Sequence, residues 1–229
     1  AVFDRIPVGA RPVGVAGAFI AIADDANSVF INPAGMSQLG QLEMTSYYTT
    51  LFGLQELMQT VLSGVVSTPA GHVGLFYQSL GGAVYRESTV GVVWSHAFGS
   101  RLMAGGLLRA QTLSVKDYGT ASTASFDAGL LIRLPYQTRL GVTTYNINRS
   151  KWASRRDDSP GLTSVGISRI SQRLTVAFQV DHETQRGFST RVGQEFRLID
   201  QLSLRGGLTT APAMVFFGLG LQVKRVTAD

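Results

Sequence analysis

Apolar and polar residues alternate along most of the chain after about residue 85. In residues 126–134, one set of alternate positions holds Phe, Ala, Leu, Ile and Leu, and the other set includes Asp127 and Arg133. The same separation recurs in residues 174–181 and 188–198. A period of two residues is typical of a β-strand with two unlike faces. The alternation predicts an all-β protein, but it does not distinguish a membrane barrel from a soluble sandwich.

Strand pattern and turn-forming residues together predict twelve strands. Most of them are longer than the roughly 5–6 residues usual in soluble proteins, and they fit a tilted transmembrane strand of about 9–11 residues. The predicted strands cover residues 41–51, 59–68, 72–80, 88–98, 101–114, 123–134, 138–148, 161–170, 173–183, 188–198, 202–210 and 214–223.

The connections between these strands alternate in length. Tight turns at 69–71, 99–101, 135–137, 171–173 and 199–201 are separated by mostly longer segments, such as 115–122 and 149–160. Short turns at one end and longer loops at the other are typical of an outer-membrane barrel. A further turn is expected at 224–225 and a strand from residue 226. We therefore expect the sequence to be truncated at its C-terminal end, or the last strand to be unpaired.

Several charged residues lie in the middle of predicted strands. Unpaired in a soluble core, each would cost several kcal/mol. They are satisfied if they face a wet or ion-paired lumen while the apolar face meets lipid. A soluble sandwich that turns them to water remains the alternative. The polar residues predicted to face the lumen are Arg109, Asp127, Arg133, Arg139, Asp181, Arg191, Glu195, Arg197 and Arg205.

Composition narrows the class of protein. The chain has no cysteine, which excludes a disulfide scaffold and thiolate chemistry. Its longest uncharged apolar run, residues 12–23, is too short for a membrane-spanning helix. The net charge of +5 would suit nucleic acid, but the arginines lie singly on alternating positions, so we expect no nucleic-acid partner. The chain starts with Ala1, and we interpret it as a processed, mature protein.

Residues 1–40 do not show the strand pattern. Asn32 is a good N-cap, Pro33 suits a first helical position, and Gly40 would close a helix at 33–39. Asp24 and Asp25 could start a helical turn at 24–30 together with Asn27. The sequence predicts a compact helical plug in residues 1–40, followed by a β-domain in residues 41–229.

This N-terminal stretch resembles the outer-membrane fatty-acid-transporter (FadL/TodX-like) superfamily, particularly its PorV/PorQ-like branch. The matching motif is Gly-Ala-Arg-Pro-x-Gly-x-x-Gly-Ala-Phe from residue 9, then Ala-x-Ala-Asp-Asp-Ala-Asn from residue 21, then Asn-Pro-Ala-Gly from residue 32. The resemblance implies a transmembrane antiparallel β-barrel of fourteen strands, with a lumen blocked by an N-terminal hatch. The hatch residues are then Gly14 and Gly17 for close packing, Asp24, Asp25 and Asn27 for a helix start, and Asn32, Pro33, Ala34 and Gly35 for a turn.

The resemblance implies passive transport of small hydrophobic molecules across the bacterial outer membrane. The alternative is a PorV-like accessory or scaffold barrel with protein partners in a secretion or assembly complex. The expected surroundings are outer-membrane lipid and lipopolysaccharide, which the charged loop at 149–158 could contact.

No enzyme pattern is visible, so we expect no catalytic residue, metal or cofactor. His72, His96 and His182 are scattered without the spacing of metal ligands. The adjacent pair Asp24 and Asp25 falls short of a calcium loop, which needs further spaced oxygen ligands.

Overall fold

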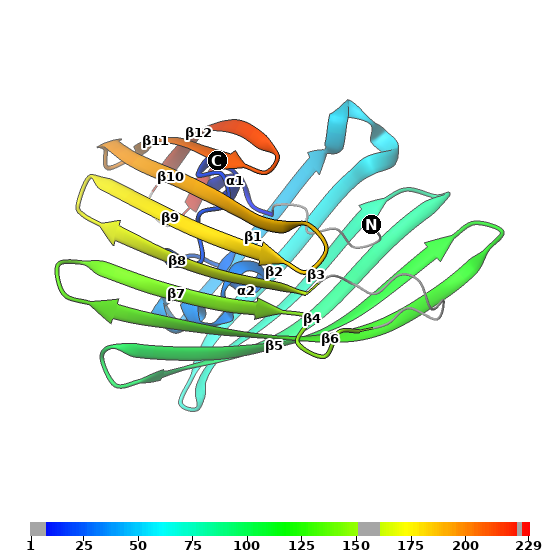
Figure 1. Cartoon of the computed structure of the whole chain (residues 1–229), viewed down its shortest axis with the longest axis horizontal. Helices are drawn as coiled ribbons and strands as arrows, with labels where there is room; N and C mark the ends of the chain where they lie inside the picture. The colour runs from blue at the N-terminus through cyan, green and yellow to red at the C-terminus, as the bar shows by residue number, and fades with distance from the viewer. Residues whose placement is uncertain (1–7, 151–160, 224–225) are drawn as a thin grey trace.

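The structure is a computed structural model of the 229-residue chain, and it describes residues 8–150, 161–223 and 226–229. In these residues, thirteen strands form one sheet in which each strand pairs antiparallel with the next one along the chain (Figure 1). The strands are β1 (Leu42–Thr50), β2 (Met58–Thr68), β3 (Gly71–Gly81), β4 (Tyr85–Phe98), β5 (Leu102–Val115), β6 (Gly119–Leu134), β7 (Thr138–Tyr145), β8 (Leu162–Ile170), β9 (Leu174–Glu183), β10 (Gly187–Ile199), β11 (Leu202–Thr210), β12 (Ala213–Val223) and β13 (Val226–Ala228).

The prediction of an all-β chain with long antiparallel strands is confirmed, and the predicted strand ends lie within four residues of the observed ones. The resemblance implied fourteen strands in a closed barrel, and here the structure differs. In the described residues, β1 pairs with β2 and β13 pairs with β12, but β1 and β13 do not pair with each other. Because β13 spans three residues, it adds little to the sheet, which curves without closing.

The two ends of the sheet carry different connections. One end, called the turn end below, carries the short turns at 69–70, 99–101, 135–137, 171–173 and 200–201. The opposite end, called the loop end, carries the other connections in the described residues, including 51–57 between β1 and β2. Two 3-10 turns, η2 (Leu51–Gly53) and η3 (Gln55–Leu57), lie in that connection. The predicted alternation of connection lengths is present only in part: 51–57 and the connection from β7 to β8 are long, whereas 82–84, 116–118, 184–186 and 211–212 are as short as the turns, because the flanking strands extend further than the pattern indicated.

The two faces of the sheet differ as the alternation predicted. On β5, Leu108 points outward and is 57% exposed, whereas its neighbour Leu107 points inward and is 1% exposed. Between the ends of β5, β6, β9 and β10, no outward position holds Asp, Glu, Lys or Arg. Since no second sheet packs on this sheet in the described residues, the structure excludes the soluble sandwich, in which two apolar faces would meet.

The N-terminal segment, residues 8–40, lies on the concave side of the sheet (Figure 1). It contains α1 (Ala10–Gly14), α2 (Ser28–Ile31) and the 3-10 helix η1 (Pro33–Gln38). Phe19, Ile20 and Met36 have no exposed surface, and the segment forms most of the apolar core. The helix predicted at 33–39 is present as η1, while the sequence pattern missed α1. No helix in the described residues is long and apolar enough to cross a membrane.

Inward-facing glycines let this segment lie directly on the strands. A Cβ atom at Gly105 would come within 2.6 Å of the Pro33 carbonyl carbon, and one at Gly129 within 2.2 Å of Asn32 Oδ1. A Cβ at Gly193 would come within 2.4 Å of the Val15 carbonyl oxygen. Interiors are close-packed, so any side chain here would push the segment away from the wall. This explains why strands β5, β6 and β10 contain glycines, although glycine inside a strand usually weakens a sheet.

Candidate functional site: the interior of the sheet

Arg11 in α1 is the centre of an ion-pair cluster inside the sheet. Its Nε and Nη2 atoms donate to the two carboxylate oxygens of Glu195 on β10, at 2.9 and 3.1 Å. Its Nη1 atom donates to Asp24 at 2.8 Å and to Asp25 at 2.9 Å. The planar guanidinium can bind one carboxylate through two atoms while its third nitrogen meets the others. One arginine thereby ties two parts of the N-terminal segment to the wall.

The cluster continues through two arginines of the wall. Arg139 on β7 donates to Asp24 at 3.4 Å and to the Ile22 carbonyl oxygen at 2.9 Å. Arg205 on β11 donates to Glu195 at 2.6 Å and to Asp229 at 2.6 Å. We call this set of ion pairs the Arg11 network, and it lies toward the turn end of the sheet. Its members are Arg11, Asp24, Asp25, Arg139, Glu195, Arg205 and Asp229.

Burial and neighbouring charge act in opposite directions on the ionisation of this cluster. Burial disfavours the charged guanidinium of Arg11, but the carboxylates of Asp24, Asp25 and Glu195 together outweigh this and raise its pKa above the ordinary value. Burial raises the pKa of Asp25, and the charge of Asp24 adds to this, while Arg11 acts in the opposite direction. Arg11 therefore stays protonated at any physiological pH.

Asp24 and Asp25 do not start a helix, which corrects the expectation for this pair. The helix α2 begins later, at Ser28, and Asn27 occupies the preceding position without a side-chain cap. Asp25 accepts a hydrogen bond from the Asn27 backbone N–H at 2.9 Å, and both aspartates bind Arg11. The ion pairs with Arg11 are favoured over helix capping, because leaving a buried charge unpaired costs more free energy than leaving a helix uncapped.

The turn at Asn32, Pro33, Ala34 and Gly35 joins two parts of the N-terminal segment to β6. Asn32 Oδ1 accepts from the Ala34 backbone N–H at 3.1 Å, and Nδ2 donates to the carbonyl oxygens of Ile20 at 2.8 Å and Leu130 at 3.1 Å. Pro33 is the first residue of η1. A Cβ at Gly35 would come within 2.2 Å of the Ala23 carbonyl oxygen, so glycine is required there.

Gly14 and Gly17 face arginines of the wall. A Cβ at Gly14 would lie 3.2 Å from Arg205 Cβ, and one at Gly17 would lie 2.7 Å from Arg191 Nη1. Gly17 also has a φ of +74°, a backbone conformation that residues with side chains rarely adopt. Gly14 therefore makes room for Arg205, and Gly17 makes room for Arg191, which donates to the Ala16 carbonyl oxygen of the segment.

Two further ion pairs lie nearer the loop end. Arg191 on β10 donates to Asp181 on β9 at 2.5 Å and to the Ala16 carbonyl oxygen at 3.1 Å. Arg109 on β5 donates to Asp127 on β6 at 2.7 Å. Asp127 also accepts from the Asn146 backbone N–H at 2.8 Å. These pairs link neighbouring strands, and Arg191 also holds the N-terminal segment.

Arg133 and Arg197 differ from the other predicted lumen residues. Both occupy inward positions of their strands, β6 and β10, but they lie at the turn end and are exposed. Among the described residues, no carboxylate lies within ion-pair distance of either. The structure therefore brings seven of the nine predicted lumen residues into ion pairs and leaves these two at the rim.

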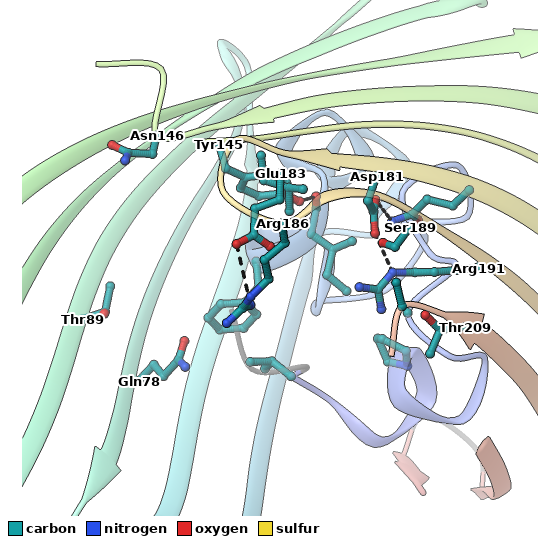
Figure 2. A pocket seen from close by; sticks show the side chains of 18 of the residues that line it. Gln78, Thr89, Tyr145, Asn146, Asp181, Glu183, Arg186, Ser189, Arg191 and Thr209 are labelled. Atoms are coloured by element: carbon teal, nitrogen blue, oxygen red, sulfur yellow. Dashed lines mark hydrogen bonds and ion pairs between the residues drawn. The ribbon is translucent and has the colours of Figure 1, made fainter. Parts of the chain in front are cut away.

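A cavity of about 360 Å³ opens toward the loop end, above the N-terminal segment. Pro12, Phe30 and Ile31 of that segment form its floor. Figure 2 shows Gln78 and Thr89 on one side of the cavity, Asp181, Ser189, Arg191 and Thr209 on the other, and Glu183 with Arg186 between them. The lining combines apolar side chains with placed polar groups, as small-molecule sites do.

Sequence reasoning missed Arg11 and most of this lining. Gln78, Thr89 and Thr209 lie near strand ends, where polar residues are ordinary, so no local pattern singled them out. A signal for Arg11 did exist, since it is the only charged residue between Arg5 and Asp24. The described residues hold no group of three or more His, Asp or Glu side chains that could bind a metal ion. The charged loop at 149–158 lies largely outside them.

The fold defined by these observations is that of an outer-membrane β-barrel. The CymD monoaromatic hydrocarbon channel superposes with a TM-score of 0.69 at 14% identity, covering 97% of this chain and 91% of that chain. The Pseudomonas putida toluene transporter TodX gives 0.67 at 10% identity, covering 98% and 91%. A Pseudomonas aeruginosa FadL homologue gives 0.65 at 12% identity, covering 89% and 80%.

No protein-family model matches the sequence, and no curated protein matches it. The solved structures thus support the FadL-like resemblance at the level of the fold. The more specific PorV/PorQ-like assignment remains a prediction. The expected location in a bacterial outer membrane agrees with the fold of these neighbours.

Proposed function

We propose that the chain is an outer-membrane β-barrel that lets small hydrophobic molecules diffuse across the bacterial outer membrane. The observation that carries the proposal is the combination of an outer face that is apolar, and uncharged along β5, β6, β9 and β10, with a cavity on the inner face. The outer face suits hydrocarbon, because strands β2 to β11 each hydrogen-bond to a neighbour on both sides and present apolar side chains to lipid. The neighbours named above as hydrocarbon or toluene channels support the same function.

In this proposal, residues 1–40 are a hatch and residues 41–229 are the barrel wall. The hatch forms the floor of the cavity, and the Arg11 network holds it to the wall. A solute would enter at the loop end, where the cavity opens, and occupy the cavity before passing on. No catalytic step is needed, because diffusion down a gradient drives the transport.

The proposal is tested by the uptake of radiolabelled p-xylene into Gram-negative cells that lack their own hydrocarbon channels. Expression should raise the initial uptake rate several-fold. Ser189→Trp fills the cavity from β10 and should return uptake to the level of the empty vector. Thr190→Trp, one residue further and pointing outward to lipid, is the matched control and should leave uptake unchanged. Equal uptake with and without the folded protein would refute transport.

A second candidate function is an accessory or scaffold barrel with protein partners. It is favoured by the filling of the turn end, where the Arg11 network and the apolar N-terminal core occupy the interior. A scaffold does not conduct a solute, so a filled and rigid interior is compatible with its function. The two functions differ in one measurement: a scaffold should be recovered from native membranes with a stoichiometric partner, and it should give no uptake of p-xylene.

A further inference from the structure

Several buried polar side chains line the cavity. A pure hydrocarbon could form no hydrogen bond with them. Thr89, Gln111 and Thr209 line the cavity, and their exposed fractions are 6%, 6% and 4%. Ser125, which also lines it, is 2% exposed and donates to Gln111 Oε1 at 3.3 Å. Thr209 Oγ1 has no hydrogen-bond partner in the described part of the chain. The lining thus offers buried donors and acceptors to a ligand.

Two of these groups form a row with Gln78 across neighbouring strands. Gln78 on β3 pairs in register with Thr89 on β4, and Thr89 pairs with Gln111 on β5. Side chains at paired positions point to the same face, at about 5 Å spacing. The row therefore presents two amides and a hydroxyl side by side toward the cavity.

An apolar surface lies next to this row, nearer the hatch. Phe76 is two residues before Gln78 on the same face of β3, and its ring packs edge-on against Phe30 with centroids 4.6 Å apart. Leu107 lies further along β5 toward the turn end and also lines the cavity. A ligand that fills the cavity would thus meet apolar side chains at its inner end and amide or hydroxyl groups beside it.

Each arginine that lines the cavity has a carboxylate partner. Arg191 pairs with Asp181 at 2.5 Å, and Arg186 pairs with Glu183 at 3.6 Å. Arg109 pairs with Asp127 behind it at 2.7 Å. Since each of these three arginines has a carboxylate partner, the lining does not provide an uncompensated positive charge for an anionic ligand.

We infer that the preferred solute is an uncharged aromatic molecule that carries a hydroxyl group, such as a phenol. This inference rests on the proposed transport function and specifies its substrate class. The volume of about 360 Å³ lies in the range of small-molecule sites and exceeds the roughly 150 Å³ that suffices for benzene. A hydrocarbon can form no hydrogen bond with the row of Gln78, Thr89 and Gln111, whereas a phenol hydroxyl can both donate and accept there.

The inference is tested by binding to the full chain in lipid nanodiscs, with protein-free discs subtracted. Ligand-observed NMR gives dissociation constants for p-cresol, p-xylene and p-methylbenzoate, which match in size and differ in one group. We expect p-cresol to bind about tenfold more tightly than p-xylene, which corresponds to one satisfied buried hydrogen bond. It should also bind more tightly than the anion p-methylbenzoate.

Variants connect the preference to the polar row. Thr89→Val keeps the shape of the side chain and removes the hydroxyl, and Gln111→Leu removes the amide. Each should reduce the preference for p-cresol to about twofold, and p-xylene should bind as tightly as before or more tightly, because the replacement removes a buried polar group. Thr112→Val, on the outward face of β5, is the matched control and should keep the full preference.

Equal or tighter binding of p-xylene by the unchanged protein would overturn the inference, as would a preference that survives in both variants. These failures are distinguishable from failure of the transport proposal. If p-xylene uptake is catalysed but p-cresol has no advantage, transport stands and the substrate class is wrong. If the folded protein catalyses no uptake of either solute, transport itself fails.

Discussion

The two ends of the interior are built on different principles. At the turn end, buried charges are paired in the Arg11 network and the N-terminal segment lies directly on wall glycines. At the loop end, the same inward positions carry amides, hydroxyls and paired charges around a cavity. The comparison shows that the ion pairs and close contacts that hold the N-terminal segment are concentrated at the turn end. The loop end instead holds the cavity, which a solute could enter.

Removing the centre of the Arg11 network should have the largest effect. Arg11→Ala leaves Asp24, Asp25 and Glu195 buried without their common partner. Loss of one member of a buried ion pair typically costs about 3–5 kcal/mol, and we expect about 3 kcal/mol here because the side chain is partly exposed. Urea unfolding of the protein refolded into lipid vesicles gives the free energy of unfolding.

The matched control for this change is Arg101→Ala, in the exposed turn between β4 and β5. It removes the same charge without opening the network and should change the free energy of unfolding by less than about 0.5 kcal/mol. If Arg11→Ala were as stable as Arg101→Ala, the turn end would not depend on ion pairing.

Adding one methyl group to the wall should have an intermediate effect. Gly129→Ala places a Cβ within 2.2 Å of Asn32 Oδ1, so the segment or the strand must shift. Overpacking of this kind costs about 1–3 kcal/mol. Gly206→Ala is the control, because its Cβ would lie 3.8 Å from its nearest neighbour. Comparable urea midpoints for the two variants would mean that the N-terminal segment does not pack closely on β6.

Loss of the Asn32 side chain should have the smallest effect of the three. Asn32→Ala removes the cap of η1 and two hydrogen bonds that join Ile20 and Leu130, so we expect a loss of about 1–2 kcal/mol. Hydrogen exchange should show faster exchange in residues 18–38 and unchanged exchange in β3 to β5. Uniform acceleration across the sheet would instead assign Asn32 to the stability of the whole wall.

Local sequence pattern was sufficient for the strands and for their two faces. A strand turns its side chains to alternate sides, so the separation of Phe126 and Leu130 from Asp127 can be recognised without any tertiary information. The turn at Asn32 and Pro33 was equally accessible, because an N-cap and a first-turn proline act within a few residues.

Tertiary structure alone decided which charges meet and where space remains. Arg11 and Glu195 are 184 positions apart, and no local pattern relates them. Asp24 and Asp25 have the sequence features of a helix start, yet both pair with Arg11, because leaving that buried charge unpaired would cost more free energy. The row of Gln78, Thr89 and Gln111 likewise exists only through the register of three strands. Short-range geometry is encoded locally, whereas the partners of buried charges depend on how distant strands are brought together.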